Sequence, residues 1–527
     1  MNRTIDPADW IAHDPDPVTA AELARCSTEE LAQRFSRPLS FGTAGLRGPV
    51  RGGPDAMNLA VVLRATWAVA QVLSDRGLAG STVIVGRDAR HGSAAFAMGA
   101  AEVLAAEGFS VTLLPQPLPT PVLAFAVRHV GAAAGIQITA SHNPPGDNGY
   151  KVYLDGGIQI VYPTDREIES ATAAAPFADE IARVPVQPSG SSWVEQYIER
   201  AAGVRRSNSG PIRVALTSLH GVGGEVAVET LRRAGFVDVH TVTSQQDPDP
   251  DFPTVGFPNP EEPGATDALL ALALDVDADV AVALDPDADR CAVGVPTPTG
   301  WRMLSGDETG WLLGDYILSQ NRTADAVVAS TVVSSRMLAA IAAHWNARHV
   351  ETLTGFKWLA RADAELPGST LVYAYEEAIG HCVDPAAVRD KDGISAAVLV
   401  CDLVATLKQA QRSPLDALDD LARRFGAHSG AAVSRPVPDS AEAAALMRRL
   451  RASSPVRLGE FACTTADLMP RTDALIFTGG DTGTSARVVV RPSGTEPKVK
   501  FYIEVTSNDR ARADALRDKL VDDVGDW

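Results

Sequence analysis

The chain has 527 residues, 45% of them hydrophobic, and a formal net charge of −19 at pH 7. At roughly 150 residues per domain, this length predicts three or four domains rather than a single core. The acidic balance, with no dense run of Lys and Arg, argues against nucleic acid as a partner, because phosphate backbones are bound by concentrated cations.

Cysteine usage and the start of the chain favour a cytoplasmic protein. The five cysteines are widely scattered and show no CxxC spacing, which argues against a disulfide framework or a structural zinc site. The first residues lack the apolar segment of a signal peptide, and no uninterrupted apolar run is long enough to span a bilayer. We therefore expect no membrane partner, and the sequence leaves the oligomeric state open.

The first expected elements are helices and a glycine-rich loop. Residues up to about Pro38 are Ala-rich and acidic, and we expect a helical lead-in. Residues 41–48 then contain three glycines, which let backbone amides approach a ligand, and Arg47, which can bind two oxygens of a phosphate. After an expected helix at residues 59–73, a strand at residues 82–85 runs into a polar turn and an Ala-rich helix.

This succession of strand, polar turn and helix recurs after the apolar runs at residues 212–216 and 327–330. Three copies of one unit predict three similar α/β domains with mixed sheets. From about Ala441 the pattern reads helix, strand, turn, strand, helix, ending at residues 511–524, which predicts a smaller α+β domain. We expect linkers at residues 185–192, 207–211 and 434–438, and domains at residues 1–206, 207–320, 321–435 and 436–527.

The most informative loop follows the apolar run at residues 135–138. A polar turn rich in Asn, Pro and Gly predicts that Ser141 lies at a strand end, on a constrained loop that faces solvent. A serine hydroxyl is a weak nucleophile without assistance, and His142 and Lys151 are two nearby proton-transfer groups. Taken alone, the same residues fit an ordinary hairpin loop better.

A second loop has the pattern of a metal site. The apolar run at residues 280–284 leads to Asp285, Asp287 and Asp289, and in extended backbone alternate side chains point the same way. Three converging carboxylates suit Mg²⁺, and Arg290 adds a cation that fits a site also holding phosphate.

Alternating aspartates also occur in EF-hands and in solvated turns. An EF-hand needs Gly at its sixth position and Glu at its twelfth, and Arg290 and Pro296 stand there. The chain has a second alternating acidic run, residues 247–251, which contains two prolines and follows no apolar strand. We therefore expect an exposed loop there rather than a metal site.

Later stretches favour a phosphosugar. An expected strand at residues 371–375 ends in Glu376 and Glu377, which can accept hydrogen bonds from vicinal hydroxyls, although a solvated turn explains them equally well. Lys357 lies beside aromatic residues, and Lys391 precedes a helix for which Asp392 is the expected N-cap. After an apolar run at residues 488–490, one tight turn has the composition of a phosphate-binding nest rather than of a bare hairpin, with Arg491, Ser493, Gly494 and Thr495.

Together these stretches resemble the α-D-phosphohexomutase superfamily, the phosphoglucomutases and phosphomannomutases. The resemblance covers roughly residues 41–502, and four motifs follow the order of the family. They are similar to its phosphoserine loop at residues 139–151, its DxDxDR magnesium loop at residues 285–290, its sugar loop at residues 376–380 and its RPSGTE phosphate loop from Arg491.

The resemblance implies four domains around a central cleft, three of them α/β and the last a smaller α+β fold. It also implies that Ser141 carries a phosphoryl group, and that this group and the three aspartates hold Mg²⁺. Lys151 and His142 would assist proton transfer, and Arg47 would contact phosphate. The implied substrate contacts are Arg290, Lys357, Glu376 and Lys391, and the implied anchors of the non-reacting phosphate are Arg491, Ser493, Gly494 and Thr495.

The expected activity is a reversible mutase that interconverts hexose 1-phosphate and hexose 6-phosphate, of glucose or mannose, with a sugar 1,6-bisphosphate as intermediate and primer. The sugar loop departs from the family pattern, because Gly-Glu-x-Ser is replaced by Tyr375-Glu376-Glu377-Ala378 and the serine hydroxyl is missing. This variant, with residues 355–358, is similar to the branch that contains phosphopentomutases and glucose-1,6-bisphosphate synthases, which is the alternative activity.

Two other classes remain as rivals. A phosphatase of the haloacid dehalogenase type would use Asp285 or Asp287 as its nucleophile, but it needs Thr or Val at the position of Asp289. A sugar-phosphate-binding protein without turnover would not need the intact Ser141 and aspartate set.

Overall fold

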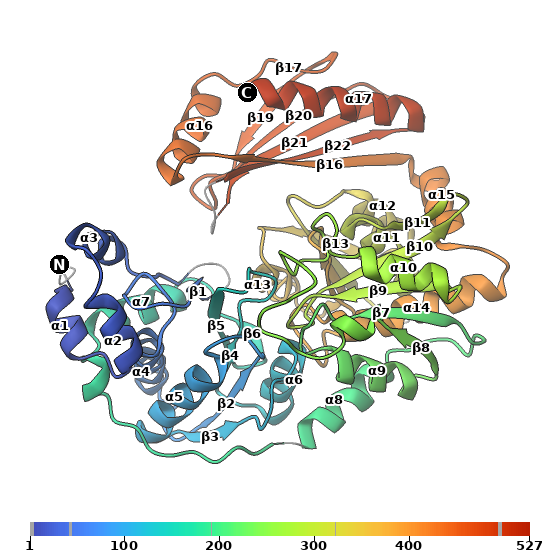
Figure 1. The fold of residues 1–527 in the computed structure, drawn as a ribbon. Helices are drawn as coiled ribbons and strands as arrows, with labels where there is room; N and C mark the ends of the chain where they lie inside the picture. Colours follow the sequence, from blue (N-terminus) through green and yellow to red (C-terminus); the bar gives the residue numbers. More distant parts are fainter. Residues whose placement is uncertain (1–4, 42–44, 191, 322, 494–497) are drawn as a thin grey trace. The chain divides into compact units, whose positions relative to one another are not determined.

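The computed structural model describes residues 5–41, 45–190, 192–321, 323–493 and 498–527 (Figure 1). They form two compact units, of which the first combines Met1–Leu304 with Ala378–Gln409 and the second combines Ser305–Glu377 with Ala410–Trp527. The segment Ala378–Gln409, which contains Lys391, therefore belongs to the same unit as the serine and aspartate loops.

The first sheet has the strand order β1-β5-β4-β2-β3, with β6 paired to β5. β2 runs parallel to β3 and β4, whereas β5 runs antiparallel to β4 and to β1, so the sheet is mixed as predicted. Its strands are β1 (Leu46–Pro49), β2 (Thr82–Arg87), β3 (Ser110–Leu113), β4 (Ala134–Ile138), β5 (Asp147–Leu154) and β6 (Ile158–Gln159).

Helices cover both faces of this sheet, and α5 and α6 lie on opposite sides of β2 and β4 (Figure 1). The predicted helix at residues 59–73 is confirmed as α4, where the Asn58 side chain accepts the N–H of Val61. The expected lead-in consists of α1–α3. The helices are α1 (Pro7–Ala12), α2 (Pro17–Leu23), α3 (Thr28–Ser36), α4 (Leu59–Asp75), α5 (Ser93–Ala106), α6 (Thr120–Val130), α7 (Thr164–Ala174), η1 (Ala178–Glu180) and α8 (Ser192–Ala202).

The second sheet has the order β11-β10-β9-β7-β8, and its central strand β9 is buried along its whole length. Its strands are β7 (Arg213–Thr217), β8 (Asp238–Thr241), β9 (Val280–Leu284), β10 (Cys291–Thr297) and β11 (Gly300–Met303), and its helices are α9 (Gly224–Arg233), η2 (Thr243–Gln245), α10 (Asp267–Asp275) and α14 (Gly393–Gln409). The Asp392 carboxylate accepts the N–H groups of Ile394 and Ser395, which confirms it as the cap of α14.

In the second unit, β12 runs parallel to both β13 and β14. These elements are α11 (Gly306–Ser319), β12 (Ala326–Thr331), α12 (Met337–His344), β13 (Arg348–Thr352), α13 (Phe356–Leu359), β14 (Thr370–Glu376) and α15 (Pro414–Phe425). The short strand β15 (Gly380–Cys382) lies in the segment that returns to the first unit.

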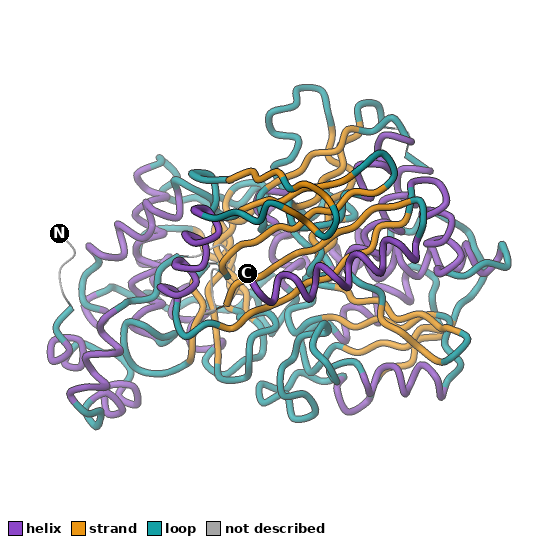
Figure 2. The backbone as a smooth tube through the Cα atoms, turned by 90° about the horizontal axis from the view of Figure 1, so that it is seen from above, coloured by secondary structure: helices purple, strands orange, loops and turns teal. Residues whose placement is uncertain are grey.

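The C-terminal sheet is antiparallel, in the order β16-β22-β21-β20-β19, and α16 and α17 lie on one face of it (Figures 1 and 2). Its elements are β16 (Ala427–Pro436), α16 (Ser440–Ala452), β17 (Arg457–Leu458), β18 (Phe461–Ala462), β19 (Thr464–Asp467), β20 (Leu475–Gly480), β21 (Thr484–Pro492), β22 (Lys498–Ser507), α17 (Arg510–Asp523) and η3 (Val524–Asp526). The predicted α+β character is confirmed, but the sequence pattern anticipated fewer strands.

One predicted linker is wrong. Residues 434–436 form the end of β16, which lies at the edge of the C-terminal sheet. A proline at the end of an edge strand removes no hydrogen bond from the interior of a sheet, so Pro436 is compatible with strand structure there.

Among the described residues, no single helix is both long and apolar enough to cross a membrane; α14 and α15 reach the required length and composition only as a bent pair.

Candidate active site

Ser141 lies in the loop that follows β4, at the strand end predicted from the sequence. Its backbone φ is 52°, in the left-handed region that costs a residue with a side chain about 1–2 kcal/mol. The Thr139 hydroxyl accepts the Ser141 N–H at 2.9 Å and supports this conformation. The loop is therefore constrained, as expected.

The expected exposure of Ser141 is wrong, because the residue is only 2% exposed. Its hydroxyl donates to Asp285 Oδ2 at 2.6 Å, although 144 residues separate the two in the chain. The same oxygen lies 3.2 Å from Nδ1 of His142. The burial of Ser141 thus comes partly from a distant segment, which the local turn composition does not reveal.

The three aspartates converge as predicted, but by a different backbone path. Oxygens of Asp285, Asp287 and Asp289 lie within 4.8 Å of one another, and all three residues are buried. The loop is a turn rather than an extended strand, since Ala288 has a φ of 56° and donates its N–H to the Asp285 carbonyl at 2.8 Å.

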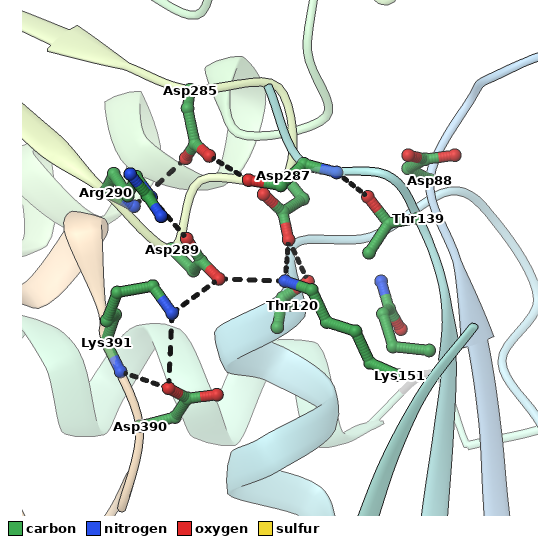
Figure 3. A network of polar contacts seen from close by, with 12 residues as sticks. Asp88, Thr120, Thr139, Lys151, Asp285, Asp287, Asp289, Arg290, Asp390 and Lys391 are labelled. Atoms are coloured by element: carbon green, nitrogen blue, oxygen red, sulfur yellow. Dashed lines mark hydrogen bonds and ion pairs between the residues drawn. The ribbon is translucent and has the colours of Figure 1, made fainter. Parts of the chain in front are cut away.

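Two lysines from different segments neutralise this cluster (Figure 3). Lys151, on β5, donates to Asp287 Oδ2 at 2.6 Å and to Asp289 Oδ2 at 2.9 Å. The Lys391 amine lies 3.2 Å from Asp289 Oδ2. Both lysines are buried, so dissolved salt screens their attraction to the aspartates only weakly.

These surroundings split the pKa values of the carboxyls. Burial raises the pKa of Asp285 well above its ordinary value, and the charges of Asp287 and Asp289 raise it further. Burial also acts to raise the pKa of Asp287 and of Asp289, but Lys151 outweighs it, and both pKa values lie below the ordinary value. The pKa of His142 is lowered well below its ordinary value by burial and by the charges of Arg290 and Arg47, so its imidazole is neutral.

The donor set fits a hard divalent cation. Oδ1 of Asp287 and Oδ1 of Asp289 are buried and accept no hydrogen bond from the described residues. The other oxygen of Asp287 is already occupied by Lys151 and by the Thr120 hydroxyl, which donates to it at 2.5 Å. Asp289 Oδ1 lies 3.7 Å from Nε of Arg290, an ion pair longer than a hydrogen bond. Carboxylate oxygens are the ligands that Mg²⁺ prefers.

A glycine allows β5 to carry Lys151 past the serine loop. A Cβ on Gly149 would lie 2.5 Å from the carbonyl oxygen of Thr139 and 2.9 Å from that of Leu46. Both oxygens belong to the backbone and cannot rotate away. The small residue two positions before the lysine is therefore required by the packing of β5 against its neighbours.

Two predicted arginines also lie in this unit. Arg47, on β1, donates to the Asn143 side chain at 2.9 Å, next to Ser141. Arg290 donates its backbone N–H to Asp285 Oδ1 at 3.0 Å and its guanidinium to the Ala378 carbonyl at 3.1 Å. The first unit thus brings together nine predicted site residues: Arg47, Ser141, His142, Lys151, Asp285, Asp287, Asp289, Arg290 and Lys391.

The remaining described site residues belong to the second unit. Lys357, on α13, and Glu376, at the end of β14, are both buried. Arg491 lies near the end of β21, and Ser493, which follows that strand, donates its N–H to the Lys498 carbonyl at 2.8 Å. The predicted phosphate-loop residues Gly494 and Thr495 lie outside the described residues.

The strand that leads to Glu376 also reaches a half-buried carboxyl. The Tyr375 hydroxyl donates to Asp307 Oδ1 at 2.7 Å, and the Ser335 N–H donates to the same oxygen at 2.8 Å. Burial raises the pKa of Asp307 to about 7, and the charges of Glu377 and Glu504 add to the effect.

This shift predicts a pH-dependent stability difference for Asp307→Asn. The pKa of Asp307 is higher in the folded state than in the unfolded state, so between about pH 4 and pH 7 the folded state binds more protons. The stability that this group contributes to wild type is therefore lost as the pH rises through that window. Asparagine keeps the acceptor oxygen without a charge. Relative to wild type, the urea midpoint of the variant should therefore rise from pH 5 to pH 8. The control is Asp325→Asn, an exposed position in the same unit; an identical pH profile for both variants would contradict the prediction.

Sequence reasoning missed two residues that orient the site. Thr120, at the start of α6, donates its backbone N–H to the Asp287 carbonyl at 2.9 Å, in addition to its hydroxyl bond. Asp390 accepts hydrogen bonds from Tyr153 at 2.8 Å and from Gln159 at 2.7 Å, which holds the adjacent Lys391. No local pattern indicates either contact, although Asp390 stands beside a predicted residue.

Comparison with known proteins gives matches along almost the whole chain. Models of the phosphoglucomutase/phosphomannomutase α/β/α domains I, II and III match residues 38–179, 193–299 and 305–425, and the model of the C-terminal domain matches residues 466–522.

Individual relatives carry several activities in their names. The chain is 40% identical to a probable phosphomannomutase of Haemophilus influenzae, over 87% of this chain and 95% of that protein. It is 34% identical to the phosphopentomutase of Mus musculus, over 94% of this chain and 89% of that protein. It is 31% identical to the glucose 1,6-bisphosphate synthase of Homo sapiens, over 97% of this chain and 91% of that protein. The crystal structure of the open form of the Paramecium phosphoglucomutase pp63/parafusin has the same fold, with a TM-score of 0.72, 21% identity and coverage of 92% of this chain and 94% of that one.

Proposed function

The chain belongs to the phosphoglucomutase/phosphomannomutase family and is an isomerase of the phosphotransferase type, and from that premise we propose that it interconverts hexose 1-phosphate and hexose 6-phosphate, of glucose or mannose. The observation that carries the proposal is the 2.6 Å contact between the Ser141 hydroxyl and the buried aspartate cluster. A nucleophile beside a cation site is what phosphoryl transfer requires.

In the proposed reaction, phospho-Ser141 gives its phosphoryl group to the free hydroxyl of the sugar phosphate. The bond between phosphorus and the serine oxygen breaks as the bond to the sugar oxygen forms, and a base takes the proton of the sugar hydroxyl and passes it to the departing serine oxygen. His142, with Nδ1 3.2 Å from the Ser141 oxygen and a lowered pKa, is a neutral acceptor in reach. The sugar bisphosphate then returns its other phosphoryl group to Ser141.

The cations of the site act through charge. Asp285, Asp287 and Asp289 would hold Mg²⁺, which when bound supplies positive charge for the oxygens of the transferring group. Lys151 and Lys391 hold Oδ2 atoms of Asp287 and Asp289, so these two carboxylates are oriented before substrate arrives. Arg47 and Arg290 add positive charge, and we propose that both contact phosphate. Lys357 and Glu376 would bind the sugar, and Arg491, Ser493, Gly494 and Thr495 the second phosphate.

A second activity follows from the sugar loop. Tyr375-Glu376-Glu377-Ala378 lacks the hydroxyl of the common Gly-Glu-x-Ser pattern, and Glu377 instead accepts hydrogen bonds from Thr331 at 3.1 Å and Ser334 at 3.0 Å. Some relatives are named phosphopentomutase or glucose 1,6-bisphosphate synthase. Either activity uses the same phosphoryl-transfer chemistry and is the alternative to the hexose assignment.

A comparison of substrates tests the proposal. We expect kcat/KM for glucose 1-phosphate or mannose 1-phosphate to exceed that for ribose 1-phosphate by at least about tenfold, since a pocket that binds a hydroxyl discriminates strongly against its loss. Coupled assays with and without glucose 1,6-bisphosphate supply the measurement. A preference for ribose 1-phosphate, or net accumulation of bisphosphate, would replace the hexose assignment by the alternative.

A further inference from the structure

A single buried arginine holds the loop that carries Ser141. The Arg90 Nη2 atom donates to the carbonyl oxygens of Ser141 at 2.6 Å and Asn143 at 2.7 Å. Its Nη1 atom donates to those of Pro144 at 2.8 Å and Asp147 at 3.2 Å. All four terminal N–H groups of one guanidinium therefore bind the main chain of a seven-residue turn, residues 141–147.

Arg90 is itself fixed from two sides. It is 4% exposed, and its Nε atom lies 3.4 Å from Asp88 Oδ2. The other oxygen of Asp88 accepts the Arg90 N–H at 3.0 Å and the Ser93 hydroxyl at 2.6 Å. The guanidinium carbon lies 4.9 Å from the ring centroid of Phe252, which is 3% exposed. A carboxylate and an aromatic face together orient a buried cation.

The acceptors show which task this arrangement serves. Ser141 is in the left-handed backbone region, and its carbonyl forms the shortest of the four bonds. Hydrogen bonds from a charged donor are stronger than neutral ones, and they stabilise a backbone conformation that is unfavourable for a residue with a side chain. Because the terminal N–H groups are taken by carbonyls, Arg90 has none of them left for a substrate phosphate.

We propose that Arg90, oriented by Asp88 and Phe252, is a positioning residue that fixes the Ser141 oxygen in line for phosphoryl transfer. This role rests on the proposed function, because it matters only if Ser141 transfers a phosphoryl group.

The test compares Arg90→Lys with Arg87→Lys. Lysine keeps the charge but presents three donors at one point, so it cannot span four carbonyls. We expect kcat to fall about a hundredfold in Arg90→Lys, the cost of a misplacement of about 1 Å, with KM for the sugar phosphate changed less than about threefold. Arg87 is the last residue of β2. Among the described residues, its side chain forms one hydrogen bond, a 3.2 Å bond to the carbonyl of the adjacent Asp88. The kcat and KM of Arg87→Lys should therefore match those of wild type.

Amide hydrogen exchange provides a readout that does not depend on turnover. Exchange at the amides of the loop, residues 141–146, should accelerate at least about tenfold in Arg90→Lys, while the strands of both sheets in this unit keep wild-type rates. Phe252→Leu, which keeps an apolar side chain but removes the ring face, should give a smaller effect of the same kind and serves if Arg90→Lys fails to fold.

Each result decides the proposal. A raised KM with unchanged kcat would make Arg90 a substrate-binding residue, and uniform acceleration of exchange would make it a general stability element; either overturns the positioning role. If wild type turned over no phosphosugar at all, the proposed function would fail, whereas localised exchange in Arg90→Lys would still support the clamp on the loop.

Discussion

Ser141→Ala is expected to lower kcat at least about ten-thousandfold, because the phosphoryl group then has no oxygen on the enzyme to bind. The alanine removes a single oxygen that contacts Asp285 at 2.6 Å and leaves the backbone path unchanged. Turnover is measured in the primed, coupled assay. Transfer of ³²P from a labelled bisphosphate, followed by a test of the label in acid, then reports whether a phosphoserine forms in wild type and is absent from the variant.

The matched control is Ser189→Ala, the same substitution at an exposed position of the first unit, which should retain wild-type activity. Both variants should unfold at the wild-type temperature within about 2 °C, since neither creates a large cavity. Two outcomes would contradict the prediction and identify an aspartate as the nucleophile. One is appreciable turnover by Ser141→Ala. The other is a ³²P label that still forms in this variant and is lost in mild base, as expected of an acyl phosphate.

The second large effect concerns the aspartate cluster. Asp287→Asn keeps the shape of the side chain but removes a charge next to Lys151, and its free oxygen becomes a weaker ligand. We expect Mg²⁺ affinity to fall at least about tenfold and kcat/KM at least about a hundredfold. Removal of Mg²⁺ by EDTA should abolish wild-type activity, and added Mg²⁺ should restore it.

Binding is measurable without turnover. At a Mg²⁺ concentration of about a hundred times Kd, wild type should gain about 2.7 kcal/mol of unfolding free energy, seen as a rise in Tm, whereas Asp287→Asn should gain far less at that concentration. Asp247→Asn makes the same change in the exposed acidic run and should respond to Mg²⁺ like wild type. Equal stabilisation of the Asp287 variant would show that this carboxylate does not hold the ion.

The predictable parts of this site follow strands. Apolar runs that end in polar turns identified β4 before Ser141, β9 before Asp285 and β14 before Glu376, because burial of a strand and solvation of its end leave a local pattern in the sequence. The motif resemblance added the expected partners of these residues.

What the sequence did not reveal depends on contacts between distant segments. Lys151 and Asp287 are 136 residues apart, and Thr120 and Asp287 are 167 apart, so no periodicity records either pair. The burial of Ser141 has the same origin, because Asp285 approaches it from another sheet. The linker expected near Ser434 failed for a different reason: an edge strand tolerates the prolines that a linker also favours.

The discontinuity of the first unit has a practical consequence for dissecting the protein. A fragment that stops at Leu304 would omit the segment Ala378–Gln409, and with it α14, which packs against β9 and β10. Such a fragment would expose an apolar face and leave Asp289 without Lys391. We therefore expect that a fragment ending at Leu304 would not fold into the complete first unit.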